Sequence, residues 1–358
     1  MDTTIQQAVQ LYDEAGAALE QGNFARSDEL HRECIALFEQ VDGPHSLNAA
    51  SVYTSLADLL LQVGDLDGAL QAAYEANAIL AALDDDCCGD DLRSLRVQAW
   101  TRTGAIQRQR AEYSQAETWL RGALDLAVGA FGEESESASE ARNELGILYK
   151  YTAEFDKAET LYHAALAHLA ALYGEQHSSV AALYHNLGGL EHARRRFAEG
   201  EPLGRKAWDI NRRLLGEDHP TTLADAAAYA GLLDGLERFA ESEPIYRRVL
   251  DGFGALYGEE HYEIAVNLNN LANVRYAQGD PGEAEALFRR AIAIKEKILG
   301  PDHPDTALSL NNLGVILREQ GRTAESLRLF RHALRIFRRN LGEQHPHTAM
   351  ARANLAAL

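Results

Sequence analysis

Six glycines recur at one constant interval along this 358-residue chain. Each belongs to a variant of the phrase L-G-E-D-H-P-x-T, and they are Gly132, Gly174, Gly216, Gly258, Gly300 and Gly342. A fixed period of about 20–50 residues is typical of a solenoid, in which each repeat buries its apolar face only by stacking on its neighbours. The period therefore predicts one elongated array of repeats instead of several globular domains.

The repeat that begins at Gly300 shows what one unit contains. Its GPDHPDT phrase is followed by two longer runs, ALSLNNLGVILREQ and AESLRLFRHALRIFRRNL, joined by GRT. Apolar residues recur at helical spacing in both runs, as Leu310, Leu313 and Leu317 do in the first. Both runs are therefore predicted to be amphipathic helices. We expect the glycine to end the second helix in a left-handed conformation and the H-P step to place proline in the first turn of the next helix.

The same pattern over the whole chain predicts an all-α fold. Ala and Leu dominate the apolar residues, which favours helix over strand. We expect helix pairs near residues 3–40, 45–83, 91–130, 133–172, 175–214, 217–256, 259–298 and 301–340, with a lone helix at 345–358. The period is irregular before Gly132, and the segment LDDDCCGDD interrupts it at residues 83–91. We therefore predict less regular, acidic helix pairs over residues 1–90 and one continuous regular solenoid over residues 91–358.

The charge of the chain limits its partners. The formal net charge is −20, which opposes binding to nucleic acid or to an anionic membrane, because both need clustered Lys and Arg. Acids outnumber bases by 17 to 2 over residues 1–90, whereas bases outnumber acids by 13 to 9 over residues 271–358. This gradient is either drift of surface charge or a sign that the two ends recruit different partners or each other. MDTTIQQAVQ does not resemble a secretory signal, and no stretch is long and apolar enough to span a membrane, so we expect a cytoplasmic protein.

Histidine and cysteine are the residues that suggest chemistry. One histidine recurs in each regular repeat, but stacked helices lie about 10 Å apart, whereas zinc ligands lie about 2 Å from one ion. We therefore expect the histidines to pack the loops and start helices. Acids surround Cys87 and Cys88 and disfavour their thiolates, and Cys34 occupies a small core position. No phosphate loop, dinucleotide fingerprint, nucleophile elbow or HExxH motif occurs. We expect no catalytic site, no metal site and no cofactor.

The order of an apolar residue, a small residue, a turn, and then Ala, an aromatic and Ala resembles the tetratricopeptide repeat. The small residues are Gly104, Gly146, Gly188, Ala230, Ala272 and Gly314, and the aromatic residues are Tyr113, Phe155, Phe197 and Phe239. The 42-residue period with L-G-x-x-H-P and L-N-N-L is most similar to the long repeats of kinesin light chains and many bacterial proteins. The resemblance covers nearly the whole chain. It implies a right-handed α-solenoid whose first helices line a concave groove that binds a protein or a peptide.

Asparagines are the best candidates for contacts in that groove. Asn186, Asn270, Asn312 and Asn354 share one position of the first helix. The resemblance implies that such an asparagine hydrogen-bonds the backbone of an extended peptide, to which an amide can both donate and accept. The alternative is that the asparagines bridge neighbouring helices. The predicted groove residues are Lys150, Tyr151, His185, Asn186, Asn269, Asn270, Asn273, Tyr276, Asn311, Asn312, Arg318 and Asn354.

The predicted function is a scaffold or adaptor that binds a partner peptide or helix without catalysis. Kinesin-light-chain grooves are expected, by resemblance, to use basic residues, but Ala228, Asp234 and Gly235 interrupt the series here, which indicates a mixed polar groove. Two alternatives stay open. One is a module that self-associates weakly, head to tail, through its acidic and basic ends. The other is a regulator that senses a small peptide.

Overall fold

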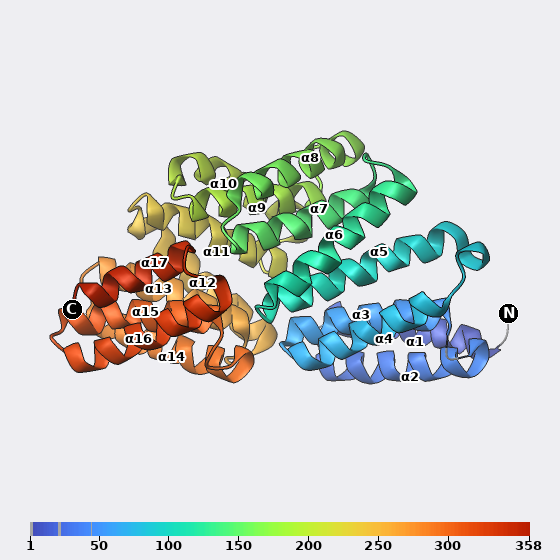
Figure 1. Cartoon of the computed structure of the whole chain (residues 1–358), viewed down its shortest axis with the longest axis horizontal. Helices are drawn as coiled ribbons and strands as arrows, with labels where there is room; N and C mark the ends of the chain where they lie inside the picture. Colours follow the sequence, from blue (N-terminus) through green and yellow to red (C-terminus); the bar gives the residue numbers. More distant parts are fainter. Residues whose placement is uncertain (1–2, 21–22, 44) are drawn as a thin grey trace. The chain divides into compact units, whose positions relative to one another are not determined.

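The computed structural model describes residues 3–20, 23–43 and 45–358, and all of its regular elements are helices (Figure 1). They are α1 (Thr3–Glu20), α2 (Phe24–Asp42), α3 (Leu47–Val63), α4 (Leu66–Ala82), α5 (Asp85–Gln109), α6 (Tyr113–Phe131), α7 (Glu136–Tyr151), α8 (Phe155–Tyr173), α9 (Ser178–Ala193), α10 (Phe197–Leu215), α11 (Pro220–Gly235), α12 (Phe239–Tyr257), α13 (Tyr262–Ala277), α14 (Pro281–Leu299), α15 (Pro304–Glu319), α16 (Thr323–Leu341) and α17 (Pro346–Ala356). The predicted all-α repeat solenoid is confirmed. We call the odd-numbered helices A helices and the even-numbered ones B helices.

The expected helix pairs and the terminal helix are all present. Only the start of α5 differs by more than a few residues, because one helical turn begins at Asp85 and the helix then breaks at Gly89, whose φ is 53°. The predicted irregularity at 83–91 is therefore this break. The side chains of residues 85–88, including Cys87 and Cys88, lie outside the described part of the structure. Cys34 is fully buried, as expected, and its thiol donates to the Ala8 carbonyl oxygen at 3.1 Å.

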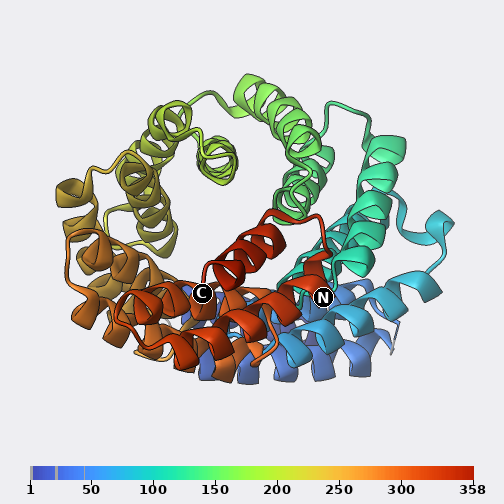
Figure 2. The same cartoon turned by 60° about the vertical axis from the view of Figure 1, so that its left-hand side comes forward.

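The chain divides into two compact units, residues 1–148 and 149–358. The first contains α1 to α6 and most of α7, and its largest core joins α1 to α5 around residues such as Phe38, Leu59 and Leu80. The second contains α8 to α17. In Figure 2 the second unit curves from the green helices through the yellow and orange ones, and the red helix α17 lies on the inner side of this curve. The division by composition at residue 90 remains a prediction.

The recurring glycine ends each B helix, but its conformation differs from the one expected. Gly216 has φ 90° and ψ 169°, and the other five glycines are similar. The positive φ agrees with the prediction, whereas a left-handed cap needs a ψ of about +47°. The prediction of a left-handed cap is therefore wrong. With this large ψ the chain leaves the helix in an extended direction toward the next A helix, and this region of φ/ψ space is accessible essentially to glycine alone.

The histidine of the phrase caps the A helix that follows, which confirms its predicted role at helix starts. In each case Nδ1 accepts a hydrogen bond from the backbone N–H two residues on, at distances of 3.1 to 3.3 Å. These capping residues are His177, His219, His261, His303 and His345. Proline takes the first helical position in α11, α15 and α17, as predicted. The closing threonine donates back to the glycine carbonyl, as Thr306 Oγ1 does to Gly300 at 3.1 Å.

Small residues allow the two helices of a repeat to approach closely. A Cβ on Gly314 of α15 would come within 2.7 Å of the buried ring of Phe330 on α16. In the α9–α10 pair the aromatic is replaced by Gly204, and a Cβ on Gly188 would lie 3.1 Å from the Gly204 nitrogen. Leu232 of the next repeat fills the space beside Gly204. The predicted small positions are therefore sites of close helix packing.

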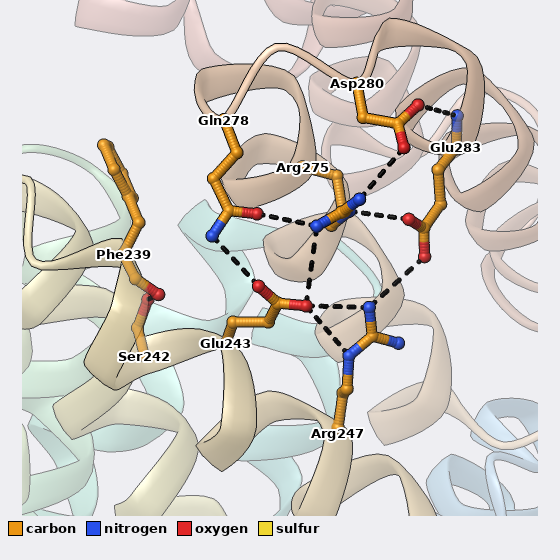
Figure 3. Close-up of polar contacts among 8 residues, drawn as sticks. All are labelled: Phe239, Ser242, Glu243, Arg247, Arg275, Gln278, Asp280 and Glu283. Atoms are coloured by element: carbon orange, nitrogen blue, oxygen red, sulfur yellow. Dashed lines mark hydrogen bonds and ion pairs between the residues drawn. The ribbon is translucent and has the colours of Figure 1, made fainter.

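Ion pairs connect consecutive repeats where each A helix turns into its B helix (Figure 3). Glu243 on α12 accepts from Gln278 Nε2 at 2.9 Å and from Arg247 at 2.8 Å, and Arg275 Nη1 lies 3.6 Å from it. Arg275 also pairs with Glu283 of α14 at 2.6 Å. Similar pairs join Arg194 to Glu159, Arg238 to Glu201, and Arg322 to Glu285. Because these side chains are mostly partly exposed, each pair contributes little to stability and mainly fixes the stacking register.

Candidate partner-binding face

The predicted groove residues of the second unit lie on its A helices. They come from the end of α7 and from α9, α13, α15 and α17. Asn270 and Asn273 lie three residues apart on α13 and therefore share one face of that helix. Asn312 occupies the corresponding place on α15, one repeat after Asn270. We call this surface the A-helix face.

Two of the predicted asparagines are buried and bonded inside the fold. Asn269 is 5% exposed, and its Oδ1 accepts from Ser309 Oγ at 2.8 Å. Asn311 is 1% exposed, and its Oδ1 accepts from Asn354 Nδ2 at 3.0 Å. These side chains join α13 to α15 and α15 to α17. The alternative considered from the sequence, that asparagines bridge neighbouring helices, therefore describes these three residues.

The asparagines next to them in sequence have a different environment. Asn270 is half-buried and Asn273 is exposed, and neither side chain has a hydrogen bond with another described residue. Asn312 is half-buried, and its Oδ1 has only a long contact of 3.5 Å with Asn311 Nδ2. Asn186, at the same position of α9, is 8% exposed. The row of four equivalent asparagines is thus not uniform, and α13 and α15 carry the members with available amide groups.

His185 is part of a buried polar set that the sequence did not reveal. Its Nδ1 lies 2.7 Å from Oδ1 of Asp225 on α11. The other carboxylate oxygen of Asp225 accepts from Asn211 Nδ2 of α10 at 2.7 Å. Asp225 is 3% exposed and Asn211 is fully buried. We call His185, Asn211 and Asp225 the first polar triad.

The same three positions form a second set two repeats later. Ser309 on α15 donates to Asn269 of α13 and accepts from Lys295 Nζ of α14 at 3.1 Å. Lys295 also donates to the Asp305 carbonyl oxygen at 3.3 Å and is 4% exposed. Burial lowers the pKa of the Lys295 ammonium, and the nearby Asp305 charge opposes this effect. We call Asn269, Lys295 and Ser309 the second polar triad.

The repeat between the two triads has an apolar equivalent. Ala227, Phe253 and Asn267 occupy the three positions, and Phe253 is 1% exposed in an apolar core. Asn267 turns away, and its Nδ2 donates to the Glu263 carbonyl oxygen of its own helix at 2.8 Å. Polar triads therefore alternate with an apolar contact along the A helices.

Tyr276 and Arg318 lie beside the asparagines at the ends of α13 and α15. Burial, followed by a hydrogen bond with the Glu319 carboxylate, raises the pKa of Tyr276 to about 12, so its hydroxyl is neutral and donates to Glu319. Arg318 is half-buried and has no hydrogen bond or ion pair with another described residue. This end of the A-helix face therefore offers a guanidinium and a phenol ring.

Lys150 and Tyr151 lie at the other end of the second unit. Lys150 Nζ is 6.0 Å from the centre of the Tyr151 ring, and a Cβ on Gly189 of α9 would lie 3.3 Å from Lys150 Nζ. The Tyr151 carbonyl oxygen lies 3.0 Å from His345 Nε2 of α17. Because His345 Nδ1 accepts the capping hydrogen bond from His347, Nε2 carries the proton and donates to Tyr151. Residues 194 positions apart thus meet across the second unit.

One apolar pocket lies away from the A-helix face, between α10 and α12. It has a volume of about 210 Å³, and Trp208, Leu223 and Ile245 are among the residues that line it. Arg248 at its edge is paired with Glu217 at 2.5 Å. No group of at least three His, Cys, Asp or Glu side chains in the described ranges could hold a metal ion. None of the helices described here is long and apolar enough to cross a membrane.

Comparison with known families agrees with the repeat geometry. A family model described as "Tetratricopeptide repeat" matches residues 6–82, 179–254, 223–297, 263–339 and 311–358. The chain belongs to the tetratricopeptide repeat family. This family assignment and the repeat fold support a protein-interaction scaffold. No curated protein matches the chain as a whole or in part.

Several solved structures resemble this tetratricopeptide-repeat chain. BtubC (BKLC) from P. vanneervenii is 24% identical, with 67% of this chain and 93% of that chain covered and a TM-score of 0.46. A Rap protein complexed with competence and sporulation factor is 14% identical, with 87% of each chain covered and a TM-score of 0.62. The apo form of RapI is 13% identical, with 82% and 98% covered and a TM-score of 0.58. The similarity to the two Rap structures shows the fold.

Proposed function

We propose that this protein binds an extended segment of a partner protein along the A-helix face of its second unit. The observation that carries the proposal is the contrast between Asn269 and Asn270. The Asn269 amide is buried and bonded to Ser309, whereas the Asn270 amide is half-buried and has no hydrogen bond within the described structure. Burying part of an amide without a partner is costly, and a bound main chain would satisfy it.

The spacing of the available asparagines suits an extended peptide. Neighbouring A helices lie about 10 Å apart, and an extended chain advances about 3.3 Å per residue. Asn270 and Asn312 are therefore matched to peptide groups about three residues apart. Asn273 adds a second amide on α13. Because an amide both donates and accepts, these contacts hold a backbone whatever its side chains are.

Other residues of the face have separate roles in this proposal. Asn269, Asn311 and Asn354 hold the A helices in register, since their amides are engaged with one another or with Ser309. Arg318 and Tyr276 select among partner side chains, the first by charge and the second by its ring. Lys150, Tyr151, His185 and Asn186 extend the face toward the start of the second unit.

The proposal also covers what the protein does not do. Binding by amides, an arginine and aromatic rings involves no covalent step, so we propose an adaptor without catalytic activity. The net charge of −20 supports a protein partner over a nucleic acid. We propose that the protein acts in the cytoplasm.

A calorimetric titration tests the role of the asparagines. A partner is first identified by affinity capture with the wild-type chain, and the interacting segment is then titrated into wild-type protein and into Asn270→Ala/Asn312→Ala. We expect the double variant to lose about 1–3 kcal/mol of binding free energy, because each neutral hydrogen bond contributes about 0.5–1.5 kcal/mol.

The matched control replaces two exposed amides away from this face, Gln115→Ala and Gln176→Ala. It should bind like the wild type. Equal affinity of the asparagine variant and the wild type would show that the partner does not use these amides.

A further inference from the structure

Neighbouring B helices of the second unit are joined by a repeated arginine–glutamate contact. Arg247 Nη2 of α12 donates to Glu283 of α14 at 3.4 Å (Figure 3), and Arg289 Nη2 of α14 donates to Glu325 of α16 at 2.7 Å. The next position in this series, one repeat after Arg289, is Arg331 on α16. Arg331 is exposed and has no hydrogen bond or ion pair with another described residue. The contact is thus present on one side only.

Helix α17 exposes a face that the preceding A helix, α15, buries. On α15, Ala307 is fully buried, Leu310 is 5% exposed and Gly314 is buried, because α16 packs on them. The equivalent residues of α17, one repeat later, are Ala349, Arg352 and Ala356, and all three are exposed. Among the described helices, none packs on α17 as α16 packs on α15.

The charge beside this face is opposite to that of the chain as a whole. Helix α16 carries one acid, Glu325, and a series of exposed arginines, namely Arg328, Arg331, Arg335, Arg338 and Arg339. Arg335 and Arg339 both lie close to the single carboxylate of Asp302, at 3.6 and 3.8 Å. The guanidinium groups therefore exceed the acids around them. Arginine favours carboxylate partners, which it can bind in a bidentate manner.

We propose that α16 and α17 form a docking surface for one amphipathic helix of a partner protein, whose acidic first turn pairs with Arg331. This helix-docking surface consists of Arg331 and Leu327 on α16 and of Ala349 and Ala356 on α17. It is separate from the A-helix face and does not depend on the function proposed for that face. The partner helix takes the place that a B helix holds in each complete repeat.

The B helices of the chain itself define what the partner helix carries. In α14, Glu283 is followed directly by Ala284, and Phe288 comes four residues later; Glu325, Ser326 and Phe330 repeat this order in α16. The acid meets the arginine of the preceding B helix, the small residue crosses the A helix, and the aromatic fills the core between them. The expected partner sequence is therefore Glu, a small residue, three residues of any type and an aromatic.

One difference from the internal repeats refines this expectation. Glu285 of α14 binds Arg322 from the turn before α16, whereas Leu327 replaces this glutamate on α16. An arginine in the turn before the partner helix would have no acid to meet there. The partner therefore needs an apolar residue at that point, which would pack on the half-buried Leu327.

A labelled peptide provides the test. The probe has the sequence of residues 281–299, with glutamate at the positions of Arg289 and Arg290, so that it is acidic and retains Glu283, Ala284 and Phe288. Its binding to the full chain is followed by fluorescence anisotropy. We expect saturable binding that weakens about fivefold or more in Arg331→Glu, because an attractive ion pair becomes repulsive. A probe in which Glu283 is replaced by arginine should bind Arg331→Glu more tightly than it binds the wild type.

Two controls make the result specific. Arg205 on α10 belongs to the same series of positions, three repeats before Arg331, and Arg205→Glu applies the same charge change inside the array and should leave probe binding unchanged. A probe with Ala284→Leu should bind weakly, because a large side chain cannot cross Ala356 closely. Circular dichroism melting of Arg331→Glu should match that of the wild type, since Arg331 is an exposed residue.

Three outcomes would overturn the proposal. The first is an absence of saturable binding. The second is equal weakening by Arg331→Glu and Arg205→Glu, which would show that the probe responds to net charge alone. The third is a concentration-dependent increase in the sedimentation coefficient of the wild type that Arg331→Glu abolishes, which would identify a second copy of this chain as the occupant.

Discussion

The two polar triads occupy the same place in the repeat, with one repeat between them, but carry ionisable groups of opposite sign. The first has the Asp225 carboxylate between His185 and Asn211, and the second has the Lys295 amine beside Ser309. In the intervening repeat, Phe253 fills the corresponding space. The stacking of helices thus creates one site that accepts an acid, a base or an aromatic ring. The partners around the site decide which of them is stable there.

The difference also separates what the fold needs from what it tolerates. Because Phe253 serves the middle repeat, neither triad is required for stacking. A buried ion or polar set often contributes no more stability than a well-packed apolar group of similar size, yet removing one member leaves the others unpaired at considerable cost. The three predictions that follow test whether the two triads behave in this way.

The largest effect is expected from Asp225→Ala. This change leaves His185 and the buried Asn211 amide without their acceptor and opens a small cavity. We expect a loss of about 3 kcal/mol in the free energy of unfolding, measured by urea denaturation. Asp209→Ala, on the surface of α10, is the control and should change stability by less than about 1 kcal/mol. A similar loss in both variants would show that the first polar triad is not a special contact.

A smaller effect is expected from Ser309→Ala in the second polar triad. Lys295 Nζ then loses one of its two acceptors and Asn269 Oδ1 loses its donor, at a cost of about 1–3 kcal/mol. Adding Lys295→Met should restore part of this stability, because the amine that needs the acceptor is gone. Urea denaturation of the two single variants and the double variant measures this coupling. Strictly additive effects would contradict the contact between Lys295 and Ser309.

The smallest effect is expected from Lys295→Met alone, and it depends on pH. Burial lowers the pKa of Lys295 in the folded protein, whereas the unfolded chain keeps a pKa of about 10.4. Between these two values the unfolded state binds more protons, so wild-type stability falls as the pH drops from about 10.4 toward the folded pKa. At pH 7 we expect the variant to be within about 1 kcal/mol of the wild type or more stable.

Raising the pH toward 10 should remove this advantage of Lys295→Met, because the wild type then gains stability and the variant does not. Urea denaturation at pH 7, 8.5 and 10 gives the difference at each value. Parallel stability curves for the two proteins would mean that Lys295 keeps its ordinary pKa in the folded state.

Much of the repeat could be predicted from the sequence because its signals are local. A histidine followed by proline marks the start of an A helix, and each of the five regular histidines accepts the capping hydrogen bond. The glycine before it was recognised as a helix end, but its ψ was not. The observed ψ of 169° at Gly216 depends on where the next helix lies, which the stacking of repeats determines.

The candidate site was less predictable because neighbouring residues have different roles. Asn269 and Asn270 are adjacent, and the sequence does not distinguish the buried amide from the half-buried one. Asp225 and Lys295 were missed, although a signal was present. Asn211 and Lys295 stand at B-helix positions where Phe253 and Phe337 are buried in other repeats. A polar residue in an otherwise apolar series of core positions indicates a buried partner.

The sequence by itself determined the period, the helix boundaries, the capping residues and the positions of close packing, since each depends on residues within one turn or one helix pair. Only the tertiary structure decided which asparagines are engaged, which repeats hold a polar triad, and where Arg331 and the exposed face of α17 lie without a neighbour. These features depend on contacts between side chains far apart in the chain, up to 194 positions for His345 and Tyr151. Such contacts depend on how successive repeats stack, which no single repeat encodes.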